Sequence, residues 1–424
     1  IINLVHINDL YPDREPTSSN QDYLTTRWMH QLQSEIQLGK WSINPVISFT
    51  DYERITENYT TFLTSDLETD RRQTQSTFFR TFFFRNTASM NNLRWGSLQL
   101  GLESTIDNGG GSRLLDGEQF MEDVALFASA EIKVSPAISI RPGIRHSYNS
   151  VYETAPTPSL NVKYDLSSST QLRLGYGRGF RVPSLRELYH EFIDTNHNII
   201  GNPDLTPEFS HNINFNLTRD FRKIGLKTSI SGFYNDIEDR IMFFVPEQSN
   251  EPTTYLNISE FKTLGGTLNV TWQHKGLRLS PGIAHIGRYQ QLNESQTDVP
   301  SFIFNWEVNT VLSYRLAKLG TTFSAFYKFN GSLKDYRMVD PDGDLEFTPE
   351  LQGEEGFHLM DISVSQSIGN TLNMTLGARN LFNITAVDNN FSSGGAHGST
   401  GGNTSVGYGS SFFLRLNYQF KTKN

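Results

Sequence analysis

The stretch that decides the fold reads Val124-Ala125-Leu126-Phe127-Ala128-Ser129-Ala130-Glu131-Ile132-Lys133-Val134. Its even-numbered residues are all apolar, whereas Ser129, Glu131 and Lys133 on the other face are polar. A period of two residues is the period of a β-strand, because successive side chains point to opposite faces of a sheet. The stretch therefore predicts a strand with one apolar face.

The same alternation recurs along the chain, for example at 138–148, 171–178 and 412–420. Many runs are about ten residues long, whereas strands of soluble sandwiches usually have about 5–6 residues. A propeller would repeat every 40–50 residues or so with a blade signature, and the sequence shows no such repeat. The pattern predicts an all-β protein with roughly seventeen or eighteen strands, whose boundaries are uncertain by a few residues.

The connections between these strands are alternately short and long. The short ones are Leu38-Gly39-Lys40, Asn91-Asn92, Ser135-Pro136, Ser167-Ser168-Ser169, Phe221-Arg222-Lys223, His274-Lys275-Gly276, Lys318-Leu319 and Ile368-Gly369-Asn370. The long polar ones are near 58–72, 107–117, 179–207, 246–253, 289–299, 333–354 and 382–407. Tight turns at one end and long loops at the other are typical of a transmembrane antiparallel β-barrel, whose short turns face the periplasm.

The composition agrees with a membrane barrel. Charged residues make up 19% and aromatic residues 12% of the 424 residues, which fits a wall with a lipid-facing side and aromatic girdles. The formal net charge of −9 argues against a nucleic-acid partner. Cysteine is absent, which excludes disulfides and thiolate metal sites. No segment approaches the ~18–20 consecutive apolar residues of a membrane-spanning helix.

Two motifs carry more information than the alternation. The first is Gly175-Tyr176-Gly177-Arg178-Gly179-Phe180-Arg181-Val182-Pro183-Ser184-Leu185-Arg186-Glu187-Leu188-Tyr189, followed by Gly201-Asn202-Pro203-Asp204-Leu205-Thr206-Pro207-Glu208. The second is Gly377-Ala378-Arg379-Asn380-Leu381-Phe382-Asn383. The prolines of the first motif cannot serve a central strand, so they belong to strand ends and to one structured loop, residues 179–207, called the box loop below.

These motifs resemble the FRAP…NPNL box and the G-x-x-N-L-F element of TonB-dependent outer-membrane receptors. The last strand, which ends at Phe420, is a third match. The resemblance implies part of a 22-stranded barrel in the outer membrane of a Gram-negative bacterium. Residues 1–424 would be the barrel's C-terminal portion of roughly 18 strands, and the N-terminal plug and the first strands would lie outside this chain.

The resemblance implies a transporter, and the sequence shows no enzyme motif and no catalytic or resident metal-binding residues. We expect TonB-dependent import of a scarce, bulky nutrient, first of all an iron complex, either a ferric siderophore or haem. The alternatives are cobalamin, an oligosaccharide or a peptide, and in other classes a passive porin or an outer-membrane barrel enzyme. The expected partners are the TonB complex, which would bind through the plug, and the outer-membrane lipid. A surface lipoprotein is a further candidate partner.

The candidate ligand-binding residues are His197, His190, Arg186, Tyr189, Asn196 and His397. Haem receptors of the family use a histidine of the box loop as an axial iron ligand, and here we favour His197 over His190. The apolar spacing of Leu185 and Leu188 suggests instead that the segment before His190 packs onto its neighbours. No cofactor is expected, although Asp340, Asp342 and Asp344 have the oxygen ligands that calcium prefers.

Alternation also assigns the two faces of the wall. Leu172, Leu174, Leu414 and Leu416 are predicted to face lipid. The arginines predicted to face the lumen are Arg141, Arg145, Arg173, Arg178 and Arg415. Since arginine suits carboxylates and phosphates, we expect them to pair with carboxylates of the plug rather than with the substrate.

Overall fold

A computed structural model describes residues 2–6, 15–115, 117–193, 197–244, 252–291, 302–339, 348–392 and 400–420. These residues form a large antiparallel sheet with little helix, as the alternation predicts. Within the described residues, no helix has the length and apolar character needed to cross a membrane.

The wall is a sheet of 19 strands that pair with their neighbours along the chain. Its strands are β1 (Ile2–His6), β2 (Thr17–Gln33), β3 (Ile36–Leu38), β4 (Trp41–Phe62), β5 (Arg72–Leu93), β6 (Gly96–Gly111), β7 (Gln119–Lys133), β8 (Ile138–Asn149), β9 (Thr157–Ser167), β10 (Thr170–Arg181), β13 (Glu208–Phe221), β14 (Leu226–Phe244), β15 (Thr254–His274), β16 (Leu277–Gln291), β17 (Ile303–Leu316), β18 (Thr321–Asn330), β21 (Phe357–Ile368), β22 (Leu372–Arg379) and β25 (Ser411–Tyr418). The short 3₁₀ helix η1 (Arg222–Ile224) forms one turn. Because β2 and β3 both pair with β4, they act as one interrupted strand of the wall.

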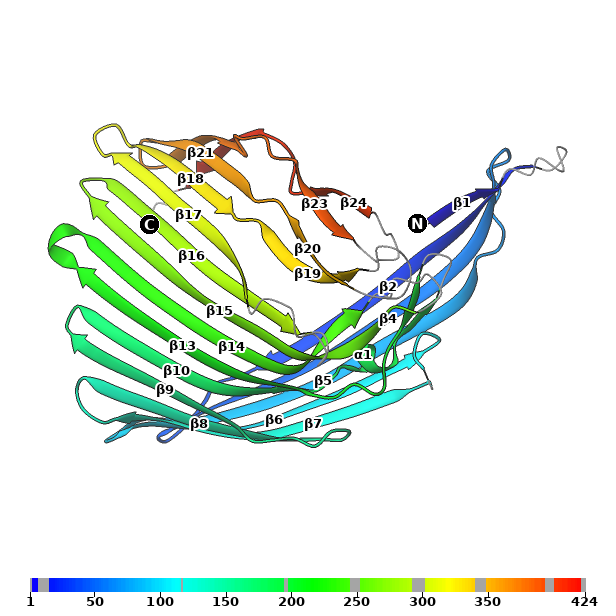
Figure 1. Cartoon of the computed structure of the whole chain (residues 1–424), viewed down its shortest axis with the longest axis horizontal. Coiled ribbons are helices and arrows are strands. Elements are labelled where there is room, and N and C mark those ends of the chain that lie inside the picture. Colours follow the sequence, from blue (N-terminus) through cyan, green and yellow to red (C-terminus); the bar gives the residue numbers. More distant parts are fainter. Residues whose placement is uncertain are drawn as a thin grey trace.

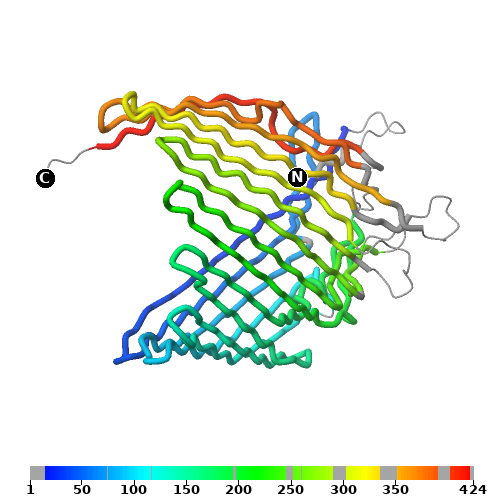
Figure 2. Tube along the Cα trace, turned by 60° about the vertical axis from the view of Figure 1, so that its left-hand side comes forward, coloured from blue at the N-terminus to red at the C-terminus, as the bar shows by residue number. Residues whose placement is uncertain are grey.

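The strands curve into a wall with the turns and the long connections at opposite rims (Figures 1 and 2). In the described residues, β1 pairs with β2 and β25 pairs with β22, with no ladder between β1 and β25. Most short turns lie where the sequence predicts them. One prediction was wrong by about two residues: the turn near Asn91-Asn92 lies at Arg94-Trp95, because the β5–β6 ladder shifts register between Met90 and Leu93.

Several segments predicted as loops contain strands. Segments 58–62 and 107–111 extend β4 and β6. The predicted loop 333–354 forms the hairpin β19 (Leu333–Val339) and β20 (Thr348–Glu354). The predicted loop 382–407 forms β23 (Ala386–Ser392) and β24 (Thr400–Ser405), and β20 pairs with β23 in a separate four-stranded sheet. These strands were missed because a hairpin outside the membrane needs no continuous apolar face.

Exposure identifies the outer face of the wall. Leu126, Leu174 and Leu414 are 65%, 46% and 60% exposed, as expected of side chains that meet lipid. One face assignment was wrong. Arg178 has the same parity as Leu174, and the β10–β13 ladder runs without a register shift through this region, so Arg178 lies on the outer face.

The inner face of β5–β8 holds a charged network. Glu103 on β6 accepts from Arg85 and from Arg145, whose Nη2 lies 2.7 Å from a Glu103 oxygen. A second carboxylate, Asp123, lies 3.7 Å from Arg145. Arg145 is therefore already paired with carboxylates of its own wall.

The wall also pairs glycines with phenylalanines across strands. Phe127 lies directly opposite Gly101, and a Cβ on Gly101 would lie 2.0 Å from its ring. The same arrangement occurs at Gly232–Phe215, Gly287–Phe304 and Gly377–Phe413. The phenyl ring covers the bare backbone of its partner, which offsets the weakness of glycine in a strand.

The face assignment predicts the outcome of two arginine substitutions on β25. Leu414→Arg places a charge on the lipid-facing side and should lower the free energy of unfolding in vesicles by about 2 kcal/mol. Asn417→Arg, on the inner face of the same strand, should change it by less than about 0.5 kcal/mol. Denaturant titration followed by tryptophan fluorescence measures both. Equal losses for the two variants would contradict the face assignment.

Candidate functional site

The box loop begins with a short helix, α1 (Leu185–Tyr189). Ser184 caps it: its hydroxyl accepts the N–H of Glu187 at 3.3 Å, and a Glu187 oxygen accepts the N–H of Ser184 at 2.7 Å. This reciprocal capping box satisfies two backbone donors that the helix start would otherwise leave free. Pro183, directly before the cap, lacks an N–H and is fully buried.

Arg181, at the end of β10, ties the helix to the next strand. Its Nη1 lies 3.0 Å from Glu187, and its Nη2 lies 2.6 Å from Glu208 at the start of β13. Glu208 also accepts the N–H of Ile241 on β14 at 2.8 Å. Burial raises the pKa of Glu187, but the hydrogen bonds from Ser184 and Arg181 outweigh burial and hold that pKa below its usual range.

An apolar cluster anchors the loop to the wall. Leu185 and Leu188 of α1 are 5% and 0% exposed. They pack with Met121, Leu205 and Ile241, which come from β7, the loop and β14. Burying a leucine side chain contributes roughly 1.5–3 kcal/mol, so α1 is held firmly. The packing predicted from the spacing of Leu185 and Leu188 is confirmed.

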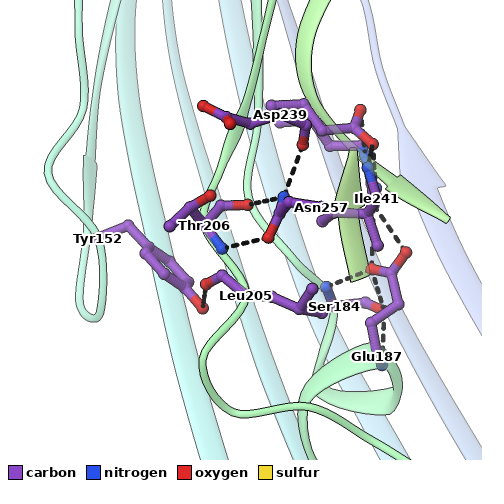
Figure 3. A network of polar contacts seen from close by, with 10 residues as sticks. Tyr152, Ser184, Glu187, Leu205, Thr206, Asp239, Ile241 and Asn257 are labelled. Carbon is purple, nitrogen blue, oxygen red and sulfur yellow. Dashed lines mark hydrogen bonds and ion pairs between the residues drawn. The ribbon is translucent and has the colours of Figure 1, made fainter. Parts of the chain in front are cut away.

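The second half of the box closes back on the helix. The N–H of Gly201 donates to the carbonyl of His190 at 2.7 Å, and the N–H of Asn202 donates to the carbonyl of Glu187 at 2.9 Å. The carbonyl of Leu205 accepts the hydroxyl of Tyr152 at 3.0 Å. Figure 3 shows this contact beside the bonds of the Asn257 amide to Thr206 and Asp239. The two halves of the motif are therefore joined by hydrogen bonds into one folded loop.

Two neighbouring loops are hydrogen-bonded to the box loop. The N–H of Leu115, which follows β6, donates to the carbonyl of Tyr189 at 2.8 Å. The hairpin β11 (Glu191–Ile193) and β12 (Asn198–Ile200) bonds to Thr253, which donates to the carbonyl of Asn198 at 2.8 Å. The loops after β6, β10 and β14 are therefore linked by backbone hydrogen bonds.

The charges of three arginines act on His190, and we call these residues the arginine cluster: Arg54 from β4, Arg113 from the loop after β6, and Arg186 from α1. Arg54 lies 4.0 Å over the ring of Tyr23, and Arg113 lies 4.3 Å over the ring of Phe192. Arg113 is only 6% exposed and donates to Gln75 at 2.8 Å. Among the residues that the structure describes, no carboxylate forms an ion pair with these arginines.

The pKa of His190 reflects this electropositive environment. Burial, followed by the charges of Arg186 and Arg113, lowers the pKa of His190 from 6.5 to about 4. The imidazole is therefore neutral at pH 7, and its Nδ1 is buried without a hydrogen-bond partner. The arrangement repels cations and suits a ligand that carries negative charge.

The lowered pKa predicts a pH dependence of the box loop. The folded loop binds the proton of His190 less tightly than the unfolded chain, so this contribution to stability is complete above pH 6.5 and is lost as the pH falls toward 4. Allowing for partial exposure, we expect hydrogen-exchange protection of residues 188–193, corrected for the intrinsic rate, to fall about tenfold between pH 7 and pH 5. His190→Gln should remove most of this dependence, and an unchanged pH profile in that variant would contradict the assignment.

The structure brings four predicted site residues together and leaves two outside its described part. His190 and His197 both contact Phe192, with ring centroids 6.2 Å and 4.5 Å from it. Arg186 is exposed beside them, and Tyr189 packs against the apolar cluster. Asn196 and His397 lie outside the described residues, as do Asp340, Asp342 and Asp344. Elsewhere in the described ranges, no group of three or more histidine or acidic side chains could hold a metal ion.

The second motif, near the end of the chain, has a structural role. Asn380 and Asn383 both have positive φ angles, of 50° and 56°, which asparagine tolerates better than most residues. The Asn380 amide donates to the carbonyl of Ile384 at 2.8 Å and its oxygen accepts the N–H of Ile384. Asn383 accepts the N–H of Ser410 at 2.9 Å, which ties the end of β22 to the start of β25.

Comparison with known proteins agrees with this architecture. Residues 3–381 match a family model described as "TonB dependent receptor-like, beta-barrel". The chain belongs to this family. Members of the family are transporters and receptors of the outer membrane rather than enzymes.

Individual relatives of this receptor barrel are distant. It is 23% identical over 282 residues to the "Ferrienterobactin receptor" of Escherichia coli, a match that covers 62% of this chain and 36% of that protein. The siderophore receptor PirA of Acinetobacter baumannii matches in structure with a TM-score of 0.68 at 15% identity, covering 95% of this chain and 63% of that one. The copper transporter OprC matches with a TM-score of 0.66 at 14% identity, covering 96% and 66%. The chain thus spans about a third of the curated receptor's length.

Proposed function

We propose that this receptor barrel takes part in TonB-dependent import of a ferric siderophore that carries net negative charge. The observation that carries the proposal is the arginine cluster: Arg54 and Arg113 lie 4.0 Å and 5.7 Å from the ring of Tyr23, the charges of all three arginines act on His190, and no carboxylate pairs with them among the described residues. The name of the Escherichia coli relative supports the same class of cargo.

The chemistry of the ligand matches the cluster. Iron(III) held by three catecholates keeps a net charge of −3, since each catecholate brings two negative charges. Charged hydrogen bonds from arginine are about twice as strong as neutral ones. Arg54 lies over the ring of Tyr23 and Arg113 over the ring of Phe192, so the cluster combines positive charge with aromatic side chains.

Energy for the transport would come from the inner membrane. Family membership implies a TonB partner and an outer-membrane lipid environment. We place the TonB contact on a plug in a longer polypeptide, because the matched segment covers 36% of the Escherichia coli relative. Family membership supports a location in the outer membrane of a Gram-negative bacterium, and we propose a surface lipoprotein as a further candidate partner.

Haem is less well matched by the described geometry. An axial imidazole must present a free nitrogen to an open coordination site. Nδ1 of His190 is enclosed, and the ring of His197 stacks on Phe192 at 4.5 Å. We therefore expect His190→Ala and His197→Ala to leave any haem spectrum of the receptor unchanged. A loss of the Soret shift in His197→Ala would replace the siderophore with haem.

A growth test decides among the cargoes. A deletion strain is given a ferric catecholate, haem or ferric hydroxamate as its sole iron source, or cobalamin where the strain requires it. A defect confined to the ferric catecholate supports the proposal. A defect confined to cobalamin, or a loss of copper uptake, would reassign the cargo, and unimpaired growth on every iron source would reject iron import.

A further inference from the structure

Three prolines stand inside central strands of the wall, where proline is rare because it cannot donate to a ladder. They are Pro45 on β4, Pro142 on β8 and Pro281 on β16, and each is the fifth residue of its strand. An isoleucine follows two positions after each proline, at Ile47, Ile144 and Ile283. All three strands begin directly after a short turn, so the prolines lie at one height along the wall.

All three prolines lie on the outer face. Side chains two residues apart point to the same face of a strand, and Ile47, Ile144 and Ile283 are 41%, 54% and 41% exposed. With a rise of about 3.3 Å per residue and a tilt of about 40°, the prolines lie roughly 10 Å above the turns. This height places them near the periplasmic end of the apolar band, which is about 25 Å tall.

Each proline interrupts the ladder with the strand before it. On β7 and β8, Ser129 pairs with Gly143 and Ile132 pairs with Ile140, but the two pairs between them are missing. The register is the same on both sides of the gap, so no residue is inserted there. The gap arises because Pro142 has no N–H to donate to β7.

The same gap occurs at the other two prolines. It lies between the pairs Asn269–Gly282 and Trp272–Leu279 on β15 and β16, and between the pairs Gln33–Val46 and Ile36–Ile43 where β2 and β3 meet β4. The N–H of Ser34 still donates to the carbonyl of Pro45 at 3.2 Å, whereas the reciprocal bond cannot form. Toward the following strand the ladder is unbroken at all three prolines.

We call these three interrupted ladders the proline seams. Between the gap and the turn, each seam keeps only two or three pairs, within residues 36–43, 132–140 and 272–279. The β13–β14 hairpin, by contrast, pairs without a gap down to Phe221 and Leu226 at its turn. A backbone carbonyl that loses its ladder partner in an apolar layer is costly. A short stretch with few hydrogen bonds therefore opens more readily than a continuous ladder.

We propose that the proline seams are hinges of the wall. They open locally between the gap and the turn, so that the periplasmic rim can bend while the ladders above stay closed. In the proposed import function, this bending gives the rim room to widen as a bulky cargo leaves the lumen. The widening rests on the proposed function, whereas the hinge is a property of the backbone and does not depend on the cargo.

Hydrogen exchange of the full receptor in lipid vesicles tests the hinges without transport. In the wild type, residues 130–140 should exchange about tenfold faster than residues 218–229 of the unbroken hairpin, after correction for intrinsic rates. Pro142→Ala supplies the missing donor and should slow exchange of residues 130–140 about tenfold. Pro281→Ala should do the same for residues 270–279, and it decides the question if Pro142→Ala fails to assemble.

The matched control is Pro158→Ala, because Pro158 lies in β9 opposite Ile144 and leaves the β8–β9 ladder unbroken. This variant should keep the exchange of residues 130–140 within about twofold of wild type. Equal protection of the broken and unbroken hairpins in the wild type would overturn the proposal, as would unchanged exchange in both Pro142→Ala and Pro281→Ala. A gain in Pro158→Ala as large as in Pro142→Ala would equally count against it, since the effect would then not come from the seam.

Discussion

Gly201→Ala is expected to detach the two halves of the box loop and to abolish uptake. A Cβ at this position would lie 2.7 Å from the carbonyl carbon and oxygen of Leu188 and from the nitrogen of Tyr189. These are backbone atoms of α1, which cannot rotate away as a side-chain tip would. The helix must move and give up the bond between Gly201 and His190, at a cost of roughly 3 kcal/mol.

The experiment compares two glycines of the same motif. A Cβ at Gly177 on β10 meets no heavy atom within 4 Å, so Gly177→Ala should behave as wild type. Hydrogen exchange of residues 185–193 reports the opening of the loop, and uptake of a radiolabelled ferric siderophore reports function. Wild-type protection of the loop in Gly201→Ala would mean that the contact at Leu188 is not as close as described.

The wall was predictable because many weak signals agree. Each alternating stretch alone is weak evidence, but within each stretch the apolar residues share one face, and turns recur between the stretches. The predicted position of a turn was wrong where the register of a ladder shifts. Between Met90 and Leu93 such a shift moves the turn along the chain. Arg178 was misplaced because its charge was given more weight than its parity with Leu174.

The sequence predicts the box loop as one structured unit, but it indicates only some of the residues of the candidate ligand site. Arg186 belongs to the motif and to the arginine cluster, and His190 directly follows the first half of the motif. Arg54 and Arg113 come from a strand and a loop far away in sequence, and no local pattern marks them. Only the fold brings these segments together, since it places the loops after β6 and β10 side by side. Alternation could have placed Arg54 on the inner face of its strand, but whether it is paired can be read only from the structure.

Half-buried Arg54 and exposed Arg186 of the arginine cluster give the second large prediction. Arg54→Gln combined with Arg186→Gln should weaken equilibrium binding of a ferric tris-catecholate about hundredfold, since each charged hydrogen bond is worth about 1.5–3 kcal/mol. Arg113 is left intact because it is buried and bonds to Gln75, so its removal would also disturb the loop. Binding is measured by quenching of intrinsic fluorescence at two ionic strengths.

Two controls separate charge from shape. The double variant with lysine at positions 54 and 186 keeps both charges and should bind within about fivefold of wild type, the remaining loss reflecting the missing guanidinium fork. An uncharged ferric hydroxamate should bind the glutamine and wild-type proteins alike, because it has no net charge for the arginines to attract. If the glutamine variant bound the tris-catecholate as tightly as wild type, the cluster would be a structural feature of the loop, and the ligand site would have to lie elsewhere in the lumen.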